Sequence, residues 1–306
     1  MNFVVWLNDP GGGHGISLRP ALNALAQIYD DVNFLGIVMT NNEDAIKSKE
    51  SNIIEKKNLK NLDIDLVLFC EIEEDFLISN RESNFVSALK EASRFGIDAD
   101  KFVLDRTVLV PNFTLEKYKQ LRHSKLSILS MNCFGGLVYH RFGLPFLTPT
   151  INMLTSDKGF LNFLKNPVDN VGKELNLVRT AVNETLKIEY PVFEIGGTEW
   201  DMNHYSDFEL AKQKWRERSA RINWDNLLVV MFTDRFKFLK KFDKLPFAKK
   251  VCFVPFETDL DSGYYIDLNQ LSSPELWRAV NGIATGNVPF YDMWDMLLYG
   301  KKTPLT

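Results

Sequence analysis

The chain has 306 residues, of which 45% are hydrophobic and 25% are charged, and its formal net charge is −4. These values exclude a disordered or low-complexity chain, and the acidic balance gives no general affinity for nucleic acid or for an anionic membrane. At roughly 100–200 residues per domain, the length indicates two domains.

Short apolar segments alternate with amphipathic segments over the first third of the chain. Each apolar segment has the length of a strand, and the amphipathic segments repeat their apolar residues at helical spacing. Alternation of this kind predicts right-handed βαβ units around a parallel sheet. We therefore expect a Rossmann-like domain over residues 1–113. Its predicted strands are 3–7, 33–39, 65–70 and 101–104, and its predicted helices are 18–29 and 84–95.

The remaining residues, 114–306, have the pattern of a larger α/β domain. Its best-defined helix is 207–221, because Ser206 stands at the N-cap position and Glu209 follows at the spacing of a capping box. The aromatic-rich tail over 273–298 is expected to be helical. The other predicted elements are helices at 114–123 and 137–142, a helical region near 160–164, and strands at 125–132, 226–232 and 249–254.

The three cysteines, Cys70, Cys133 and Cys252, are odd in number and far apart. This spacing argues against a disulfide framework and against a structural zinc site. The first residues lack the pattern of a signal peptide, and apolar runs such as 227–232 are far shorter than the roughly 18 residues that span a bilayer. We therefore expect a cytoplasmic protein without a membrane span.

A glycine cluster follows the first predicted strand and is the first candidate for ligand binding. Gly11 and Gly13 stand where backbone N–H groups at a strand-to-helix turn can hold a phosphate. Ile16 occupies the place of a third glycine, and Asn41 and Asn42 replace the acid that would bind a ribose. The alternative interpretation is a wide turn without a ligand.

The segment after the strand at 125–132 is the second candidate. Its strand delivers Asn132 and Cys133 to the carboxyl edge of a sheet, where ligands of α/β proteins collect, and Gly135 and Gly136 let the chain turn into a helix. Cys133 can be a nucleophile at a helix N-terminus or a small buried thiol. The polar Asn132 needs a protein partner or a ligand. His140 can face the same site or solvent.

The residues before the helix at 207–221 form the third candidate. Asp201, His204 and Tyr205 precede its positively charged end, where a histidine can act as a general base or contact a phosphate. We therefore expect catalytic roles for His204 and Asp201 and a ligand-binding role for Tyr205.

Along the same helix, Arg218 falls on the apolar stripe beside Trp215 and one turn from Arg221. A cation on a buried face needs either a carboxylate or a bound anion. We expect these three residues to help bind an anionic ligand. An internal salt bridge of Arg218 with Asp225 or Asp234 is the alternative.

Two further acidic features end the list of candidates. Asp234 ends a buried strand, so it either orients a ligand or caps the next helix. Asp259 and Asp261 match the Asp-x-Asp pattern of divalent-ion sites on sugar diphosphates, but Ser262 and Gly263 favour a simple turn. We expect no bound metal and name no cofactor.

Five separated motifs stand out along the second part of the chain: Ser130–Gly136, Gly143–Pro145, Thr148–Asn152, His204–Tyr205, and the pattern of Trp215, Arg218, Arg221 and Asn223. Together they resemble a bacterial family catalogued as a domain of unknown function (nineteen-nineteen), whose members are often labelled exopolysaccharide or capsule biosynthesis proteins. The resemblance covers roughly 121–256 and implies no established mechanism. It adds Asn152 to the candidate ligand-binding residues. Residues 1–110 resemble the Rossmann-like module of several glycan-biosynthesis proteins.

These observations favour a transferase of glycan biosynthesis that uses a sugar phosphate or a nucleotide sugar as donor. In this hypothesis the turn at 132–136 and the two arginines hold the donor phosphates, and His204 is the base. One alternative is a non-catalytic subunit whose aromatic tail contacts a partner. Another is a Cys133-dependent acyl transferase or hydrolase with His204 or His140 as base. Each hypothesis allows a homo-oligomer and none involves nucleic acid.

Overall fold

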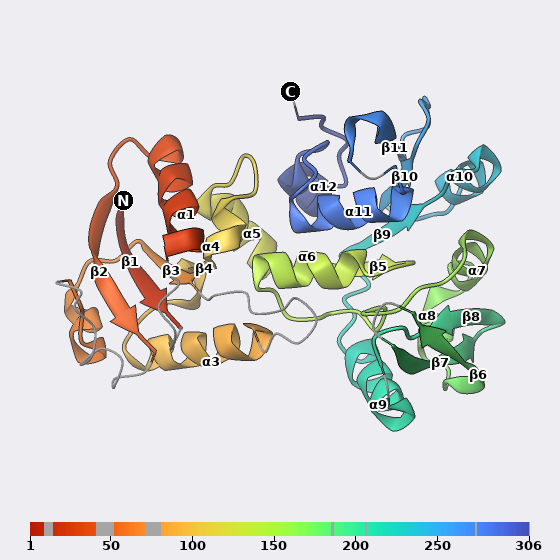
Figure 1. Cartoon of the computed structure of the whole chain (residues 1–306), viewed down its shortest axis with the longest axis horizontal. Coiled ribbons are helices and arrows are strands. Elements are labelled where there is room, and N and C mark those ends of the chain that lie inside the picture. The colour runs from red at the N-terminus through yellow and green to blue at the C-terminus, as the bar shows by residue number, and fades with distance from the viewer. Residues whose placement is uncertain are drawn as a thin grey trace. The chain divides into compact units, whose positions relative to one another are not determined.

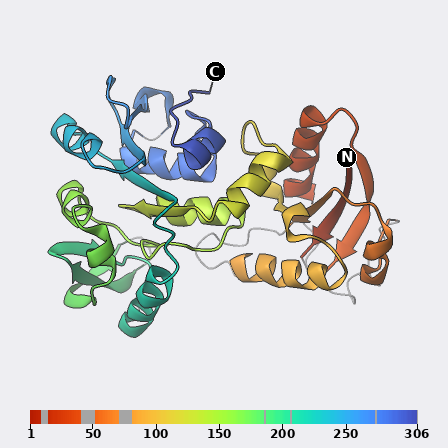
Figure 2. The same cartoon turned by 180° about the vertical axis from the view of Figure 1, so that it is seen from behind.

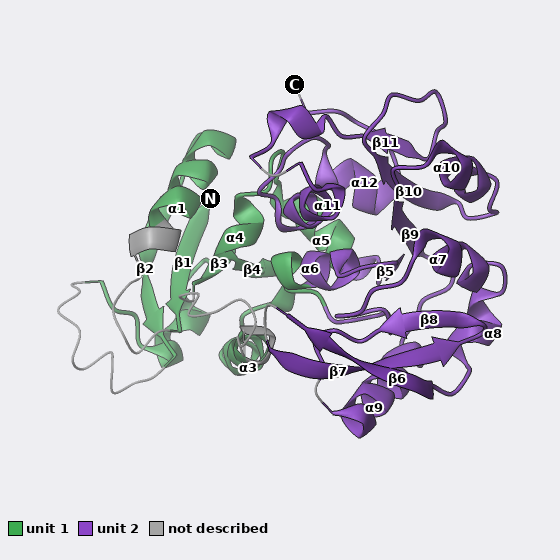
Figure 3. Ribbon diagram, turned by 45° about the vertical axis from the view of Figure 1, so that its right-hand side comes forward, with its two compact units in different colours: residues 1–122, 140–144 green, residues 123–139, 145–306 purple. Residues whose placement is uncertain are grey.

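The computed structural model describes residues 1–8, 15–40, 52–70, 81–184, 187–205, 207–272 and 274–305, and Figures 1 and 2 show its two sides. The chain forms two compact units, coloured separately in Figure 3. Unit 1 comprises residues 1–122 and 140–144, and unit 2 comprises 123–139 and 145–306. Among the described residues, no helix is both long enough and apolar enough to cross a membrane.

Unit 1 is built on a four-stranded parallel sheet, as the alternation of its segments predicts. β1 (Asn2–Leu7) lies between β2 (Asn33–Met39) and β3 (Leu66–Cys70), and β4 (Phe102–Leu104) pairs with β3. All three strand pairs are parallel. The order β2-β1-β3-β4 confirms the expected Rossmann-like sheet.

The core of unit 1 is aromatic. The rings of Trp6, Phe69 and Phe85 each lie within 6 Å of the Phe102 ring, at 5.7, 5.8 and 5.4 Å between centroids. These side chains are almost fully buried, and burial of such large apolar surfaces is the main stabilising term of a domain this size. The helices of this unit are α1 (Gly15–Ile28), η1 (Lys56–Asn61), α3 (Arg81–Arg94), η2 (Ala99–Lys101), α4 (Asp105–Val108) and α5 (Leu115–His123).

Residues 115–122 of the helix α5 belong to unit 1, whereas the sequence predicts a second domain that begins at residue 114. The Tyr118 hydroxyl donates to the Phe102 carbonyl at 3.3 Å, and the Leu115 N–H donates to the Tyr29 hydroxyl at 3.0 Å. These bonds, together with buried side chains of α5, tie the helix to the first sheet.

Unit 2 contains a second parallel sheet, in the order β11-β10-β9-β5. β9 and β10 match their predicted ranges closely, whereas β5 is shorter than the predicted 125–132. Lys125 has a φ of 48°, and the chain turns away from the sheet after Ser130, which shortens the strand at both ends. The four strands are β5 (Ser127–Ser130), β9 (Leu227–Phe232), β10 (Lys249–Val254) and β11 (Gly263–Tyr265).

A three-stranded antiparallel sheet is inserted between β5 and β9, and the sequence analysis did not predict it. β6 (Asn176–Asn183) is exposed or half-buried along its whole length, so its sequence lacks the apolar alternation that identifies a strand. β7 (Ile188–Ile195) contains Pro191, which also weakens a strand prediction. β8 (Thr198–Asp201) completes the sheet. The helices α7 (Asp157–Phe163) and α8 (Pro167–Val171) precede it.

The helix α9 (Phe208–Ser219) begins one residue later than predicted, and its N-cap is Asp207. The Asp207 carboxylate accepts from the Leu210 N–H at 2.6 Å, so it satisfies the free donor that the prediction assigned to Ser206. Ser206 itself lies outside the described residues. The basic helix α10 (Phe236–Asp243) follows β9.

The tail forms two helices where one helical stretch was predicted. Gly286 has a φ of 75° and ends α11 (Leu276–Thr285), and α12 (Met293–Tyr299) starts at the N-cap Asp292. Most of the tail's large side chains are buried, with Trp294 fully so; Trp277 and Tyr299 are the large apolar side chains exposed there among the described residues. The continuous apolar surface that would favour a docking subunit is therefore absent from the described tail.

Gly143 provides a test of packing in unit 1. Its φ is 61°, and a Cβ there would lie 2.9 Å from both Leu104 and Phe85 side-chain atoms. We expect Gly143→Ala to lower the free energy of unfolding by about 1–3 kcal/mol, measured by urea denaturation. Gly172→Ala is the control, because its Cβ would meet nothing closer than 3.6 Å. Equal stability of the two variants would contradict this account.

Candidate functional site

Side chains close the turn between β5 and α6 (Phe134–Phe142), which starts three residues before the predicted helix. The Ser130 hydroxyl donates to the Asn132 carbonyl at 2.7 Å and accepts from the Gly135 N–H at 3.1 Å. The Asn132 side-chain oxygen accepts from the Phe134 N–H at 3.2 Å. Two N-terminal N–H groups of the helix are thus satisfied by the turn itself.

The buried Asn132 side chain has a protein partner on the other side as well. Its amide nitrogen donates to the Asn281 side-chain oxygen at 3.0 Å, which joins the turn to α11. Gly135 and Gly136 are required by packing: a Cβ at Gly135 would lie 3.1 Å from the Ile128 carbonyl oxygen, and one at Gly136 would lie 3.3 Å from Ile151. Their place in the turn has a structural reason independent of any ligand.

The turn places Cys133 against His204, a residue 71 positions later. The Cys133 sulfur and the His204 Nε2 are 3.8 Å apart. Burial raises the pKa of the Cys133 thiol to about 11 and lowers the pKa of His204 below its usual value. At neutral pH the pair therefore consists of a thiol and a neutral imidazole. A neutral imidazole has a nitrogen that can accept a proton, as a general base must.

Tyr205 and Arg218 lie next to this pair. The buried Tyr205 hydroxyl donates to the Ile151 carbonyl at 3.2 Å and accepts from the Arg218 guanidinium at 2.6 Å. The guanidinium also stacks on the Phe146 ring, 5.1 Å from its centroid. Burial raises the pKa of Tyr205, the Arg218 charge opposes that rise, and the Cys133 thiolate would add to it.

Arg218 forms no ion pair with a carboxylate in the part of the chain that the structure describes. The predicted alternative, a salt bridge to Asp225 or Asp234, is therefore wrong. Asp234 is exposed and pairs with Arg235 at 3.6 Å, and the N-cap of α10 is Arg235, so Asp234 does not cap that helix. The contacts of the guanidinium within the described residues are a hydroxyl and a ring.

A short segment joins the two halves of this arrangement. The Thr155 N–H donates to the Met131 carbonyl at 2.9 Å, and Leu154 exchanges two backbone hydrogen bonds with Asp201. The end of β5 and the end of β8 are thereby held together, which brings Cys133 to His204. We call Asn132, Cys133, His204, Tyr205 and Arg218 the β5–α9 cluster.

Asn152 and Asp201 are two other predicted site residues of this region. The exposed Asn152, with a φ of 59°, is near the first turn of α6, since its side-chain oxygen is 3.8 Å from the Cβ position of Gly136. The Asp201 carboxylate faces Arg179 at 3.7 Å, and burial raises its pKa. The Asp201 side chain therefore contacts a residue of the antiparallel sheet, and the catalytic role predicted for it stays a prediction.

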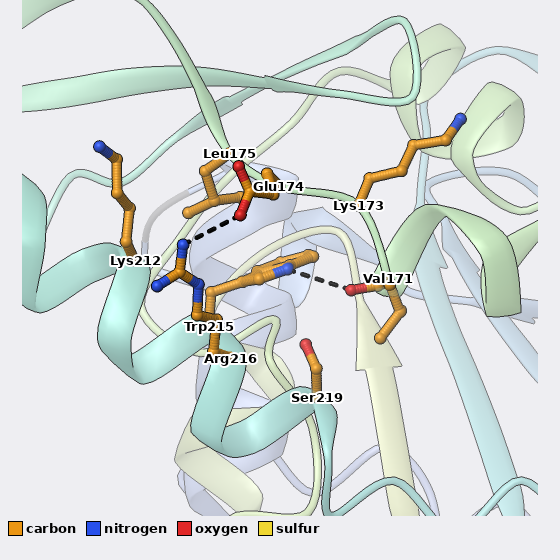
Figure 4. Close-up of a pocket in the computed structure, with 9 residues that line it drawn as sticks. Val171, Lys173, Glu174, Leu175, Lys212, Trp215, Arg216 and Ser219 are labelled. Carbon is orange, nitrogen blue, oxygen red and sulfur yellow. Dashed lines mark hydrogen bonds and ion pairs between the residues drawn. The ribbon is translucent and has the colours of Figure 1, made fainter.

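Arg221 and Trp215 do not join the cluster by any contact within the described residues. Arg221 is exposed, and its charge lowers the pKa of Glu217. Trp215 is a core residue with 3% exposure, and its indole N–H donates to the Val171 carbonyl at 3.2 Å. It lines a separate cavity of about 290 Å³ with Ser219 (Figure 4). Trp215 therefore belongs to the core of unit 2, and the ligand-binding role predicted for it stays a prediction.

The remaining candidates from the sequence are Gly11, Gly13, His140 and the pair Asp259 and Asp261. Gly11 and Gly13 lie outside the described residues, so the structure does not test them. His140 is part of unit 1, and its backbone carbonyl accepts from Arg106. Asp259 and Asp261 are exposed, and among the described residues no three His, Cys, Asp or Glu side chains group as metal ligands.

Three residues of the site were not identified from the sequence. Asn281 is a half-buried residue of α11 whose side-chain oxygen accepts from Asn132, and the helical pattern does not mark it, because it lies beside the apolar face rather than within it. Phe146 stacks on Arg218 and Ile151 supplies a backbone carbonyl, and neither role has a signature in a single sequence.

The fold and the β5–α9 cluster define an α/β protein whose second unit combines a Cys–His contact with a partly buried arginine. The chain belongs to the family described as Domain of unknown function (DUF1919), which matches residues 105–299. This confirms the family resemblance read from the motifs. An uncharacterized protein of Haemophilus influenzae is 33% identical over 161 residues, which cover 51% of this chain and 73% of that protein.

The half-buried His204 gives a testable pH dependence. Because its pKa is lower in the folded state, the unfolded chain binds the proton more readily, and stability falls as the pH drops through the unfolded value near 6.5. We expect His204→Gln to reduce this loss, measured as urea unfolding at pH 5.5 and 7.5. His123→Gln removes an exposed histidine of α5 and serves as control. An unchanged difference between the two pH values in His204→Gln would contradict the assignment.

Proposed function

We propose that this protein is a transferase of exopolysaccharide or capsule biosynthesis that takes its sugar from a phosphorylated or nucleotide-activated donor in the cytoplasm. The observation that carries the proposal is Arg218, a cation that has no carboxylate partner in the described part of the chain and is fixed by Tyr205 and Phe146. A donor phosphate supplies the missing negative charge.

The location of Arg218 in the fold supports this assignment. The cluster follows the carboxyl end of β5, the edge at which open parallel sheets collect ligands. The N-terminus of α6 also adds a partial positive charge on the same side as Cys133. Asn152, near the first turn of that helix, is a further hydrogen-bonding group for the ligand.

His204 is the base in this proposal. As the acceptor hydroxyl oxygen forms a bond with the anomeric carbon of the donor, the bond from that carbon to the phosphate oxygen breaks. The phosphate leaves with the bonding electrons, and the hydroxyl proton passes to the His204 ring nitrogen. The lowered pKa of His204 keeps the imidazole neutral and able to accept that proton at neutral pH. Arg218 stabilises the charge on the leaving phosphate.

Binding of the donor can be tested directly on Arg218→Gln. We expect wild type to bind one member of a panel of nucleotide sugars and sugar 1-phosphates by calorimetry, and the variant to bind it roughly 10–100-fold more weakly, because a charge-assisted hydrogen bond is lost. Arg218→Lys keeps the charge and should recover part of the affinity.

Arg216→Gln is the matched control. Arg216 lies on the same helix, exposed and paired with Glu174 at 3.1 Å, outside the cluster. It should bind the donor like wild type. Equal affinity of wild type and Arg218→Gln, or no binding across the panel, would refute the proposal.

The Cys133–His204 contact of 3.8 Å favours a second candidate, an acyl transferase or hydrolase. In that reaction the Cys133 sulfur bonds to the acyl carbon, its proton goes to His204, and the leaving group departs with its electron pair. The pKa of about 11 means that the thiol depends on His204 to react at neutral pH. This dependence makes the second candidate weaker than the first.

Acylation of Cys133 separates the two candidates. Under the transferase proposal, intact-mass analysis after incubation with a p-nitrophenyl ester or a thioester at pH 7.5 should show no adduct that depends on both residues. Cys133→Ala should retain donor binding. An acyl adduct on wild type that is lost in both Cys133→Ala and His204→Ala would instead establish the acyl transfer reaction.

A further inference from the structure

Unit 2 also has a concave surface that shares no lining residue with the β5–α9 cluster. It is a groove of about 610 Å³ formed by α7, the β7–β8 turn and α10. Figures 1 and 3 show α7 between α10 and β8. We call it the lysine groove, and the lining residues that matter are Lys158, Asn162, Lys165, Gly197, Phe238 and Lys241.

The groove concentrates positive charge in a chain whose net charge is −4. Lys158 and Lys241, from α7 and α10, have no carboxylate partner among the residues that the structure describes, and both are exposed. Lys165 donates to the neutral Asn162 side chain at 3.2 Å. All three ammonium groups therefore remain available to an anion.

The neighbouring carboxylates are occupied elsewhere. Asp157 accepts from the Thr233 hydroxyl at 2.7 Å, and Asp243 accepts from the Ser262 hydroxyl at 2.7 Å. Glu199 lines the groove and pairs with Arg179 at 3.4 Å. No carboxylate of the described residues thus neutralises the three lysines by direct pairing.

The floor and one wall of the groove are held in place by packing and hydrogen bonds. Phe238 is 9% exposed, and the ammonium group of Lys241 lies 5.9 Å from its ring centroid. The Asn162 amide donates to the Gly196 carbonyl and to the Thr198 hydroxyl, at 3.3 and 3.4 Å, which ties α7 to the β7–β8 turn. The cations therefore stand on a preformed surface.

We propose that the lysine groove binds a chain of successive phosphate groups. Its volume suits a ligand of several groups, and lysines from two helices require more than one negative charge. Each internal group of such a chain carries one negative charge and two non-bridging oxygens, so successive groups can accept from the lysines of α7 and of α10. The proposal does not depend on Arg218 or on the transferase function.

The test measures binding of linear polyphosphate to the full chain by calorimetry at 50 and 200 mM salt. The groove variant is Lys158→Gln with Lys241→Gln. The control variant is Lys240→Gln with Lys244→Gln, which removes two exposed charges of α10 and its end but none from the groove. We expect the groove variant to bind about tenfold more weakly, with a smaller salt dependence, and the control to stay within twofold of wild type.

Each other outcome overturns the proposal. Equal losses in the two variants show a diffuse cationic surface. Equal affinity for poly-glutamate removes the preference for phosphate. Binding to phosphatidylglycerol vesicles but not to soluble polyphosphate, lost in the control variant, shows a membrane-facing helix α10. Arg218→Gln should bind polyphosphate like wild type. Failure of the transferase proposal can therefore be told apart from failure of this one.

Discussion

The backbone hydrogen bonds of the segment 150–155 are the constraint on which the candidate site depends. Thr155 bonds to Met131 after β5, and Leu154 bonds in both directions to Asp201 at the end of β8. The same segment accepts the Tyr205 hydroxyl at Ile151. These bonds hold the end of β8 against the end of β5, which brings Cys133 and His204 together. Backbone pairing thus sets the positions from which the side chains of the cluster meet.

The electrostatics of the cluster follow from its burial. The Arg218 guanidinium contacts a hydroxyl and a ring, while burial raises the pKa of the Cys133 thiol and lowers the pKa of His204, so that both groups favour their neutral forms. One permanent cation beside a neutral base is an arrangement suited to an anionic ligand with a transferable proton nearby. The same residues in water would behave as an isolated arginine, a thiol and a histidine of ordinary pKa, so the protein's contribution is the desolvated environment.

The two candidate binding surfaces differ in how they are built. The β5–α9 cluster joins elements that are distant in sequence and depends on a few short, directional hydrogen bonds. The lysine groove uses flexible, exposed side chains on a rigid base formed by Phe238 and Asn162. Directional bonds are suited to selecting one ligand geometry, and exposed lysines are suited to tolerating variation along a charged chain. Both surfaces belong to unit 2, which holds most of the residues of the family match.

The sequence by itself determined the parallel α/β architecture, because buried strands such as 249–254 and helices with a regular apolar stripe carry their own periodicity. It also selected Asn132, Cys133, His204, Tyr205 and Arg218 as candidate site residues, and for Asn132 and Arg218 it showed that a partner is required. It did not reveal the sheet of β6, β7 and β8, since an exposed strand has no apolar alternation to read. Only the tertiary structure decided which partners these residues have. In it Arg218 bonds to Tyr205, Trp215 packs in the core and Asp201 pairs with Arg179. These contacts join distant segments, and they depend on backbone pairing that no local pattern encodes.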